Sequence, residues 1–259
     1  MSNENLKIGL SLPCTELPQL EAMSSIPECF EFAELSGEVV ADALLLKKSH
    51  ALWSEFDLFN FRDLIPSSLT CQLTSENSVI IQEYKKQLRG LLAQAHACNA
   101  TTAGIDPDWE KLFSDKERLE IFNDVLRSTA GDREFYDITL LIAVRVPGSG
   151  QFPVTQSLEL LHKLSNYRVE LALDIYPHEL LTIQTNWDKL LAPFRFDTAA
   201  VRFCYPSELG NKLLYKHIEP VVEALKKWQR SIMLYIAPSG KADLNELAIT
   251  AQAINPKES

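Results

Sequence analysis

Short apolar runs alternate along the chain with longer segments in which apolar positions recur every three or four residues. The short runs have the length of buried strands, and the longer segments have the periodicity of amphipathic helices. The expected strands are Lys7–Leu12, Cys29–Leu35, Leu58–Ile65, Thr101–Ile105, Asp137–Val146, Arg168–Ile175, Ala199–Cys204 and Ser231–Ile236. The expected helices are Glu16–Ser24, Gly37–Leu52, Val79–Ala97, Asp115–Ser128, Thr155–Ser165, Trp187–Leu191, His217–Arg230 and Ala242–Ile254.

Strands and helices that alternate in this way within 259 residues predict an α/β fold, a single (β/α)8 TIM barrel. A doubly wound open sheet would also alternate, but eight repeats fit closure better, and the turn after the first strand has no GxGxxG motif. No linker or low-complexity segment divides the chain, so we expect one domain over residues 1–259. The polar ends, 1–5 and 256–259, are expected to be frayed.

Three of the apolar runs carry a charge near their end and are followed by a proline. The runs LLIAVRVP, ELALDIYP and AAVRFCYP contain Arg145, Asp174 and Arg202. A buried ion costs several kcal/mol unless it is paired, so these charges need an explanation. The carboxyl ends of the strands are where TIM barrels build their active sites.

Side chains alternate between the two faces of a strand, so the phase of each run predicts where its charge points. Arg145, Asp174, Arg202 and Tyr235 all fall on the face that is expected to line the barrel interior. The second to fourth strands add candidates of less certain phase. They are Glu34, whose face alternation alone does not separate from that of Glu31, then Arg62 or Asp63, and Asp106.

The order of elements and several strand ends resemble the xylose isomerase-like barrels, which include sugar and sugar-phosphate isomerases and epimerases and metal-dependent endonucleases. The segments that carry the resemblance are CFEFAEL, SVIIQEYKKQLRGLLAQAHACNATTAGID, ITLLIAVRVPG, VELALDIYPH, AVRFCYP and SIMLYI. Family members typically hold a divalent metal with a Glu, an Asp, a His or similar ligand, and a Glu at the ends of the fifth to eighth strands. The two Glu often move the proton in isomerisation.

This sequence departs from that pattern at three of the four positions. Asp174 is retained, whereas Arg145, Arg202 and Tyr235 stand where the family has the other ligands. Two cations do not ligate a cation and repel it electrostatically. The resemblance therefore implies a degenerate site without the divalent metal, and we expect no cofactor.

Two interpretations of the charged cluster remain open. In one, Asp174 lies between Arg145 and Arg202 as a structural ion-pair cluster. In the other, Arg145 and Arg202 bind an anionic group, with the guanidinium fork matching a carboxylate or phosphate.

The functional hypothesis is an isomerase, epimerase or lyase that acts on a small anionic carbohydrate. Asp174, His178 and Tyr235 would then handle protons, and Glu34 and Asp106 would help to line the pocket. The alternative is a non-catalytic ligand-binding or scaffold protein, which the missing carboxylates favour.

Composition indicates which partners and which cellular compartment to expect. A net charge of −10 disfavours nucleic-acid binding, which relies on Lys and Arg. No apolar run approaches the roughly 20 residues needed to cross a bilayer, so we expect no membrane partner. The five cysteines form no CxxC pair, and the chain begins with no pattern typical of a secretory signal, so a reducing cytoplasm is expected. Family members often pair, which implies a homodimer.

Overall fold

Eight parallel strands close into a barrel in the order of the sequence, β1 to β8. The computed structural model describes residues 6–12, 29–37, 58–64, 77–107, 109, 112, 116–146, 159, 162, 167–176, 186–206, 211–239 and 244–254. The strands are β1 (Leu6–Leu12), β2 (Phe32–Ser36), β3 (Leu58–Asp63), β4 (Ala100–Ile105), β5 (Thr139–Val146), β6 (Val169–Ile175), β7 (Thr198–Pro206) and β8 (Ile232–Ser239). The expected single (β/α)8 TIM barrel is confirmed.

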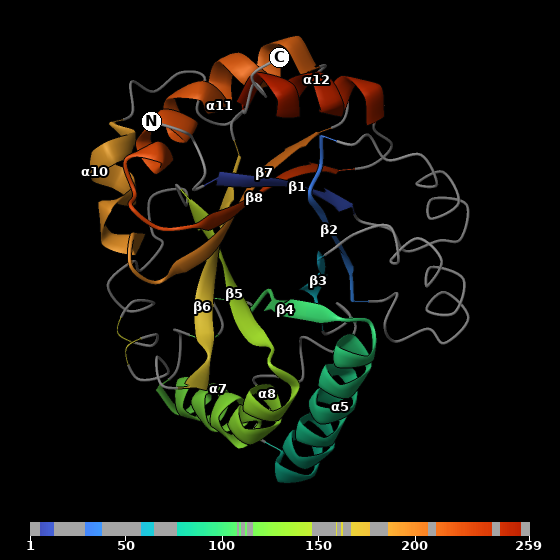
Figure 1. The fold of residues 1–259 in the computed structure, drawn as a ribbon. Helices are drawn as coiled ribbons and strands as arrows, with labels where there is room; N and C mark the ends of the chain where they lie inside the picture. The colour runs from blue at the N-terminus through green and yellow to red at the C-terminus, as the bar shows by residue number, and fades with distance from the viewer. Residues whose placement is uncertain are drawn as a thin grey trace.

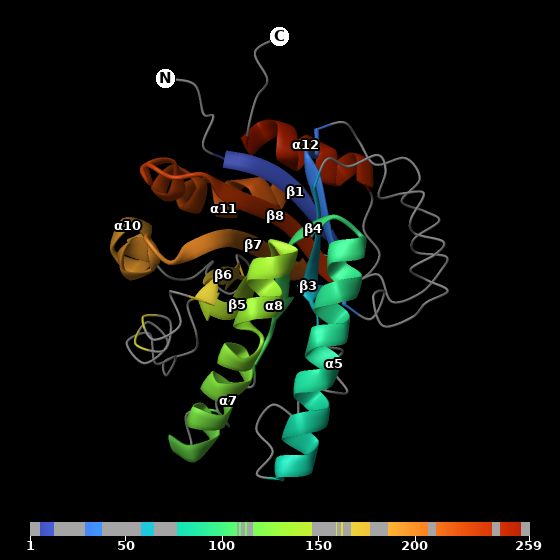
Figure 2. The same cartoon turned by 60° about the horizontal axis from the view of Figure 1, so that its bottom comes forward.

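The described helices lie around the outside of the barrel. They are α5 (Ser78–Ala97), α7 (Lys116–Ser128), α8 (Ala130–Tyr136), α10 (Trp187–Leu191), the 3-10 turn η4 (Ala192–Phe194), α11 (Asn211–Lys226) and α12 (Leu244–Ile254). Figures 1 and 2 show α11 and α12 side by side along one flank, and α5, α7 and α8 along the opposite flank. None of the helices in the described ranges is long and apolar enough to cross a membrane.

All eight expected strands form, with ends that differ from the prediction by at most three residues. The largest change of boundary among the helices is at α11, which begins at Asn211 rather than His217 and includes Pro220. Helix α8 was not predicted. It follows α7 almost directly, so its apolar positions merge with those of the preceding periodic segment. The expected helices 16–24 and 37–52 lie outside the described residues, as does 155–165 apart from 159 and 162.

Helix α5 illustrates how a periodic segment becomes a barrel helix. The side chain of Asn77 caps it by accepting a hydrogen bond from the Val79 backbone N–H at 2.9 Å. The buried residues recur every three or four positions and form one face toward the barrel; they are Tyr84, Leu88, Leu91, Leu92 and Ala95. The helix therefore follows from its apolar stripe and its polar cap.

An apolar layer crosses the barrel interior and consists of Phe32, Leu141, Ala172, Ala200 and Tyr235. The rings of Phe32 and Tyr235 meet edge to face, with centroids 5.0 Å apart. Gly9 makes room for this packing, because a Cβ at that position would lie 2.2 Å from the Phe32 ring. We call this layer the barrel floor, and it separates the two ends of the barrel interior.

Candidate active site at the carboxyl ends of the strands

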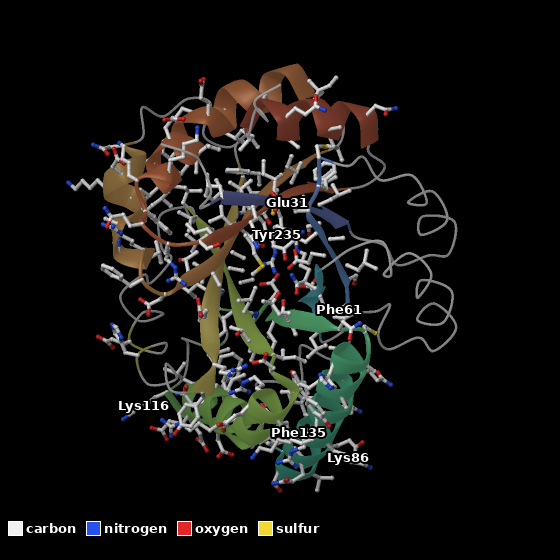
Figure 3. The ribbon with its side chains drawn as sticks, in the orientation of Figure 1. Glu31, Phe61, Lys86, Lys116, Phe135 and Tyr235 are labelled. Atoms are coloured by element: carbon white, nitrogen blue, oxygen red, sulfur yellow. The ribbon has the colours of Figure 1, made fainter. Side chains whose placement is uncertain are left out.

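Three of the four charged or polar strand positions predicted to face inward are buried inside the barrel. In the strand register, Asp174 on β6 lies beside Arg202 on β7, and Arg202 lies beside Tyr235 on β8. All three side chains are buried, with Arg202 fully enclosed. Figure 3 shows Tyr235 within the ring of strands, whereas Phe135 and Lys86 lie on the outer helices.

Arg202 is the centre of a buried ion-pair network. Its Nε and Nη2 donate to the two carboxylate oxygens of Glu34, at 2.8 and 2.6 Å. Its Nη1 donates to Asp174 Oδ1 at 3.1 Å. Glu34 is also fully enclosed, so the bidentate pair is shielded from water. Burial alone would lower the pKa of Arg202, but Glu34 and Asp174 outweigh it and hold the pKa well above its usual value.

Arg62 provides the second cation of this network. The sequence left Arg62 and Asp63 as alternatives, and Arg62 Nη2 lies 3.1 Å from Asp174 Oδ2 and donates to Cys204 Sγ at 3.5 Å. Its side chain is 21% exposed, so one edge of the network reaches the barrel mouth. Burial raises the pKa of the Cys204 thiol to about 12, which leaves it neutral.

The backbone of β4 lies very close to β3 and to the network at Gly104. A Cβ on Gly104 would lie 1.8 Å from the Arg62 carbonyl oxygen and 3.1 Å from Arg202 Nη2. Only a residue without a side chain lets β3 and the guanidinium approach β4 this closely.

Two further carboxyl groups at the mouth have perturbed acidity. Asp63 ends β3, and Asp106 follows β4, the neighbouring strand. Burial raises the pKa of Asp106 to about 6, and the negative charges of Asp174 and Asp63 add to the effect. Burial likewise raises the pKa of Asp63. Solvent still reaches Asp106. The mouth therefore presents an accessible carboxyl group that titrates close to neutral pH.

Tyr235 lies in the barrel floor and is fully enclosed. Asn60 Nδ2 donates to its hydroxyl at 2.9 Å, and Asn60 Oδ1 accepts from the Thr102 backbone N–H at 2.9 Å. Burial raises the pKa of the Tyr235 phenol well above its usual value. Asn60 was not predicted as a site residue, although it precedes Arg62 by two residues and so shares its inward face.

Arg145 occupies a different environment from Arg202. Its register places it beside Asp174, but its side chain is exposed and its guanidinium lies 4.2 Å from the centroid of the Tyr176 ring. The structure therefore brings Asp174 together with Arg62 and Arg202, and leaves Arg145 at the solvent side of the mouth. Of the other predicted site residues, Glu34 faces inward, whereas Glu31 is exposed. His178 lies outside the described residues.

The described carboxylates inside the barrel at these strand ends are engaged by arginines. Both oxygens of Glu34 and one oxygen of Asp174 already accept hydrogen bonds from Arg202, and the second oxygen of Asp174 faces Arg62. Within the described ranges, no group of three or more His, Cys, Asp or Glu side chains is arranged to hold a metal ion. A cation placed between these carboxylates would meet two guanidinium groups.

The similarity of this chain to known proteins lies in its structure. No known protein-family profile matches the sequence, and no curated protein matches it.

Several solved structures share the whole fold. A D-tagatose 3-epimerase-like protein superposes with a TM-score of 0.68 at 15% identity, covering 98% of this chain and 100% of its own. D-psicose 3-epimerase from Clostridium cellulolyticum H10, solved with D-tagatose, gives a TM-score of 0.65 at 13% identity, with 96% of each chain covered. A xylose isomerase domain protein from Alicyclobacillus acidocaldarius gives 0.65 at 10% identity, covering 96% of this chain and 97% of its own. This chain therefore has the fold of the xylose isomerase-like TIM barrel proteins.

Proposed function

We propose that this protein binds a small anionic carbohydrate at the barrel mouth and acts on it by metal-independent acid–base chemistry of the isomerase or epimerase type. The observation that carries the proposal is the partly exposed Arg62 guanidinium at the mouth, held beside Asp174 in the network that the enclosed Arg202 orders. Arg202 itself stands at a strand end where the resemblance implies a metal ligand. Several solved structures with the same fold are sugar epimerases by name.

The substrate anion is assigned to the more accessible cations. Arg202 is fully enclosed and its described hydrogen bonds go to the two carboxylates, so in this proposal it orders the network. Arg145 is exposed and the Arg62 side chain is partly exposed, and both lie at the mouth. A guanidinium fork at either position matches a sugar carboxylate or phosphate.

Asp106 is assigned the proton transfer. In its ionised form it accepts a proton from the carbon next to a sugar carbonyl. The C–H bond breaks, its electron pair forms a C=C bond to the carbonyl carbon, the carbonyl π pair moves to the oxygen, and Arg62 stabilises the resulting negative charge. Return of a proton from Asp63, on the neighbouring strand, to the opposite face of the same carbon gives the epimer. A pKa of about 6 suits a group that must both take and release a proton near neutral pH.

The alternative is a protein that binds a ligand or serves as a scaffold without catalysis. The observation that favours it is the engagement of all four carboxylate oxygens of Glu34 and Asp174 by Arg202 and Arg62. Asp174 and His178 were predicted as proton-transfer groups together with Tyr235; these assignments stay predictions.

A stepwise experiment separates the two functions. Thermal shift is first measured with Mn²⁺, Mg²⁺ and Zn²⁺, and then with sugar acids and sugar phosphates. We expect no stabilisation by the metals, and stabilisation by an anionic sugar that Arg145→Ala weakens. Stabilisation by micromolar metal would contradict the proposal.

Catalysis is then tested in D₂O by following deuterium uptake into the stabilising sugar with NMR. We expect uptake by the wild type and its loss in Asp106→Asn. The matched control is Asp124→Asn, at an exposed carboxylate on α7. Ligand binding without uptake would favour the non-catalytic binding protein, and no response to any sugar would favour the scaffold.

A further inference from the structure

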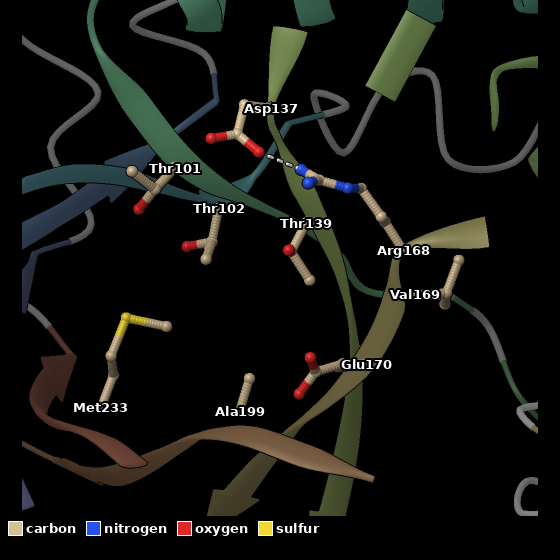
Figure 4. Close-up of a pocket in the computed structure, with 9 residues that line it drawn as sticks. All are labelled: Thr101, Thr102, Asp137, Thr139, Arg168, Val169, Glu170, Ala199 and Met233. Atoms are coloured by element: carbon tan, nitrogen blue, oxygen red, sulfur yellow. Dashed lines mark hydrogen bonds and ion pairs between the residues drawn. The ribbon is translucent and has the colours of Figure 1, made fainter. Parts of the chain in front are cut away.

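A cavity lies at the opposite end of the barrel from the candidate active site. Its volume is about 590 Å³, and its lining comes from the first residues of five strands, β4 to β8, or from the residues just before them. The lining residues are Thr101, Thr102, Asp137, Thr139, Arg168, Val169, Glu170, Ala199 and Met233 (Figure 4). We call this cavity the basal pocket.

The basal pocket is distinct from the mouth because the barrel floor lies between them. Glu170 precedes Asp174 by four residues on β6, with the floor residue Ala172 between them on the same face. On β8, Met233 precedes the floor residue Tyr235 by two residues and lies on the same face. A molecule in the basal pocket would therefore contact the barrel from below the floor and would not touch the Arg202 network.

The groups that face the basal pocket are hydroxyls, one carboxylate and a thioether. Figure 4 shows the side chains of Thr102, Thr139 and Glu170 directed toward its centre, with Met233 and Ala199 along one wall. Thr102 is 6% exposed, and its Oγ1 makes no hydrogen bond of standard geometry. Burial raises the pKa of the Tyr235 phenol, and the nearby Thr102 hydroxyl acts in the opposite direction. The pocket thus contains a buried hydroxyl with unused hydrogen-bonding capacity.

The charged side chains that line the basal pocket are paired within the protein. Arg168 pairs with Asp137 at the rim, and Glu170 accepts a hydrogen bond from Arg230 Nη2 at 2.9 Å. Arg168 also holds a left-handed backbone conformation, with φ of 53°, which a residue with a side chain adopts at a cost of roughly 1–2 kcal/mol. An ionic ligand would meet no unpaired counter-charge among the described lining residues, whereas an uncharged ligand rich in hydroxyls would match their exposed oxygens.

We propose that the basal pocket is a second binding site and that its ligand is a small uncharged polyol. Polyol hydroxyls donate to the Glu170 carboxylate and exchange hydrogen bonds with Thr102 and Thr139, while Met233 and Ala199 contact the C–H surface. The volume lies within the range of about 300–1,000 Å³ that is usual for small-molecule sites. The inference is independent of the function assigned to the mouth.

The test uses the thioether as a local reporter. The sequence has three methionines, so ¹³C-methyl methionine labelling gives a simple NMR spectrum, and Met233→Leu identifies the Met233 signal. Xylitol is the probe, and inositol hexakisphosphate is the charged comparison. We expect xylitol to shift the Met233 methyl signal in a saturable way, and the phosphate ester to leave it unchanged.

Two conservative variants locate the contact. Thr139→Val and Glu170→Gln are each expected to weaken xylitol binding by about tenfold or more, the loss corresponding to one hydrogen bond to a charged or buried group. Asp106→Asn, at the mouth, is the control and should not change the affinity. The proposal is overturned if xylitol leaves the Met233 signal unmoved, if both variants bind as tightly as the wild type, or if Asp106→Asn abolishes the effect. Circular dichroism of each variant separates lost binding from lost folding.

Discussion

Replacing Arg202 by methionine tests whether the network at the mouth is a coupled buried ion-pair system. The change removes three charge-assisted hydrogen bonds, of 2.8, 2.6 and 3.1 Å. Asp174 keeps Arg62 as a partner, but the enclosed Glu34 loses the partner of both its oxygens. Removing one member of a buried ion pair typically costs 3–5 kcal/mol, so Arg202→Met should lower the free energy of unfolding by about 4 kcal/mol.

A double-mutant cycle isolates the coupling between the two enclosed side chains. In Arg202→Met/Glu34→Met, no unpaired charge is left at position 34, so the double variant should be at least about 2 kcal/mol more stable than the sum of the single changes predicts. The assay is urea unfolding at pH 7, followed by circular dichroism.

The control for this cycle is an ion pair of similar length on the surface. Lys227 Nζ lies 2.6 Å from Asp188 Oδ2, and both side chains are more than half exposed. Lys227→Met should cost less than about 1 kcal/mol, because exposed pairs contribute little. If Arg202→Met were as mild as Lys227→Met, or if the cycle gave no coupling, the view that Glu34 depends on Arg202 would be refuted.

Three other substitutions test neighbouring features. Gly104→Ala should destabilise the fold by about 1–3 kcal/mol in thermal or urea unfolding, because its Cβ would meet the Arg62 carbonyl oxygen at 1.8 Å; wild-type stability would contradict this close approach. Asp106 has a folded pKa of about 6, above its ordinary 3.8, so its ionisation weakens the fold above about pH 6 and has no effect below about pH 4. Asp106→Asn should therefore gain stability over the wild type at pH 7 and lose that advantage at pH 4, and a pH-independent difference would argue against the raised pKa. Tyr235→Phe removes the partner of Asn60 Nδ2, and should cost about 1–3 kcal/mol with little change in the barrel's circular dichroism.

Much of the architecture was accessible from local patterns. Each strand was predicted from a short apolar run, and the strict two-residue period of β6 and β7 placed Asp174 and Arg202 on the inward face. Helix α5 was found almost to the residue because Asn77 caps a long stripe of apolar positions. Helix α8 was missed because only one residue, Thr129, separates it from α7.

The pairing of charges could not be read from the sequence. Arg145, Asp174 and Arg202 lie in register on neighbouring strands, so the sequence placed Asp174 between the other two. In the folded barrel Arg62 reaches Asp174 from β3, on the other side of the closed sheet. Alternation likewise did not show whether Glu34 or Glu31 faces inward. In the structure Glu34 faces inward and binds the guanidinium of Arg202, 168 residues away in the chain.

The sequence by itself thus determined the closed barrel and the inward face of its sixth to eighth strands, because these depend on periodicity and residue type. Only the tertiary structure decided which charges meet, which cations remain accessible and that a cavity opens below the floor. Those properties depend on closure of the barrel, which brings distant strands across its interior into contact and which no local pattern specifies.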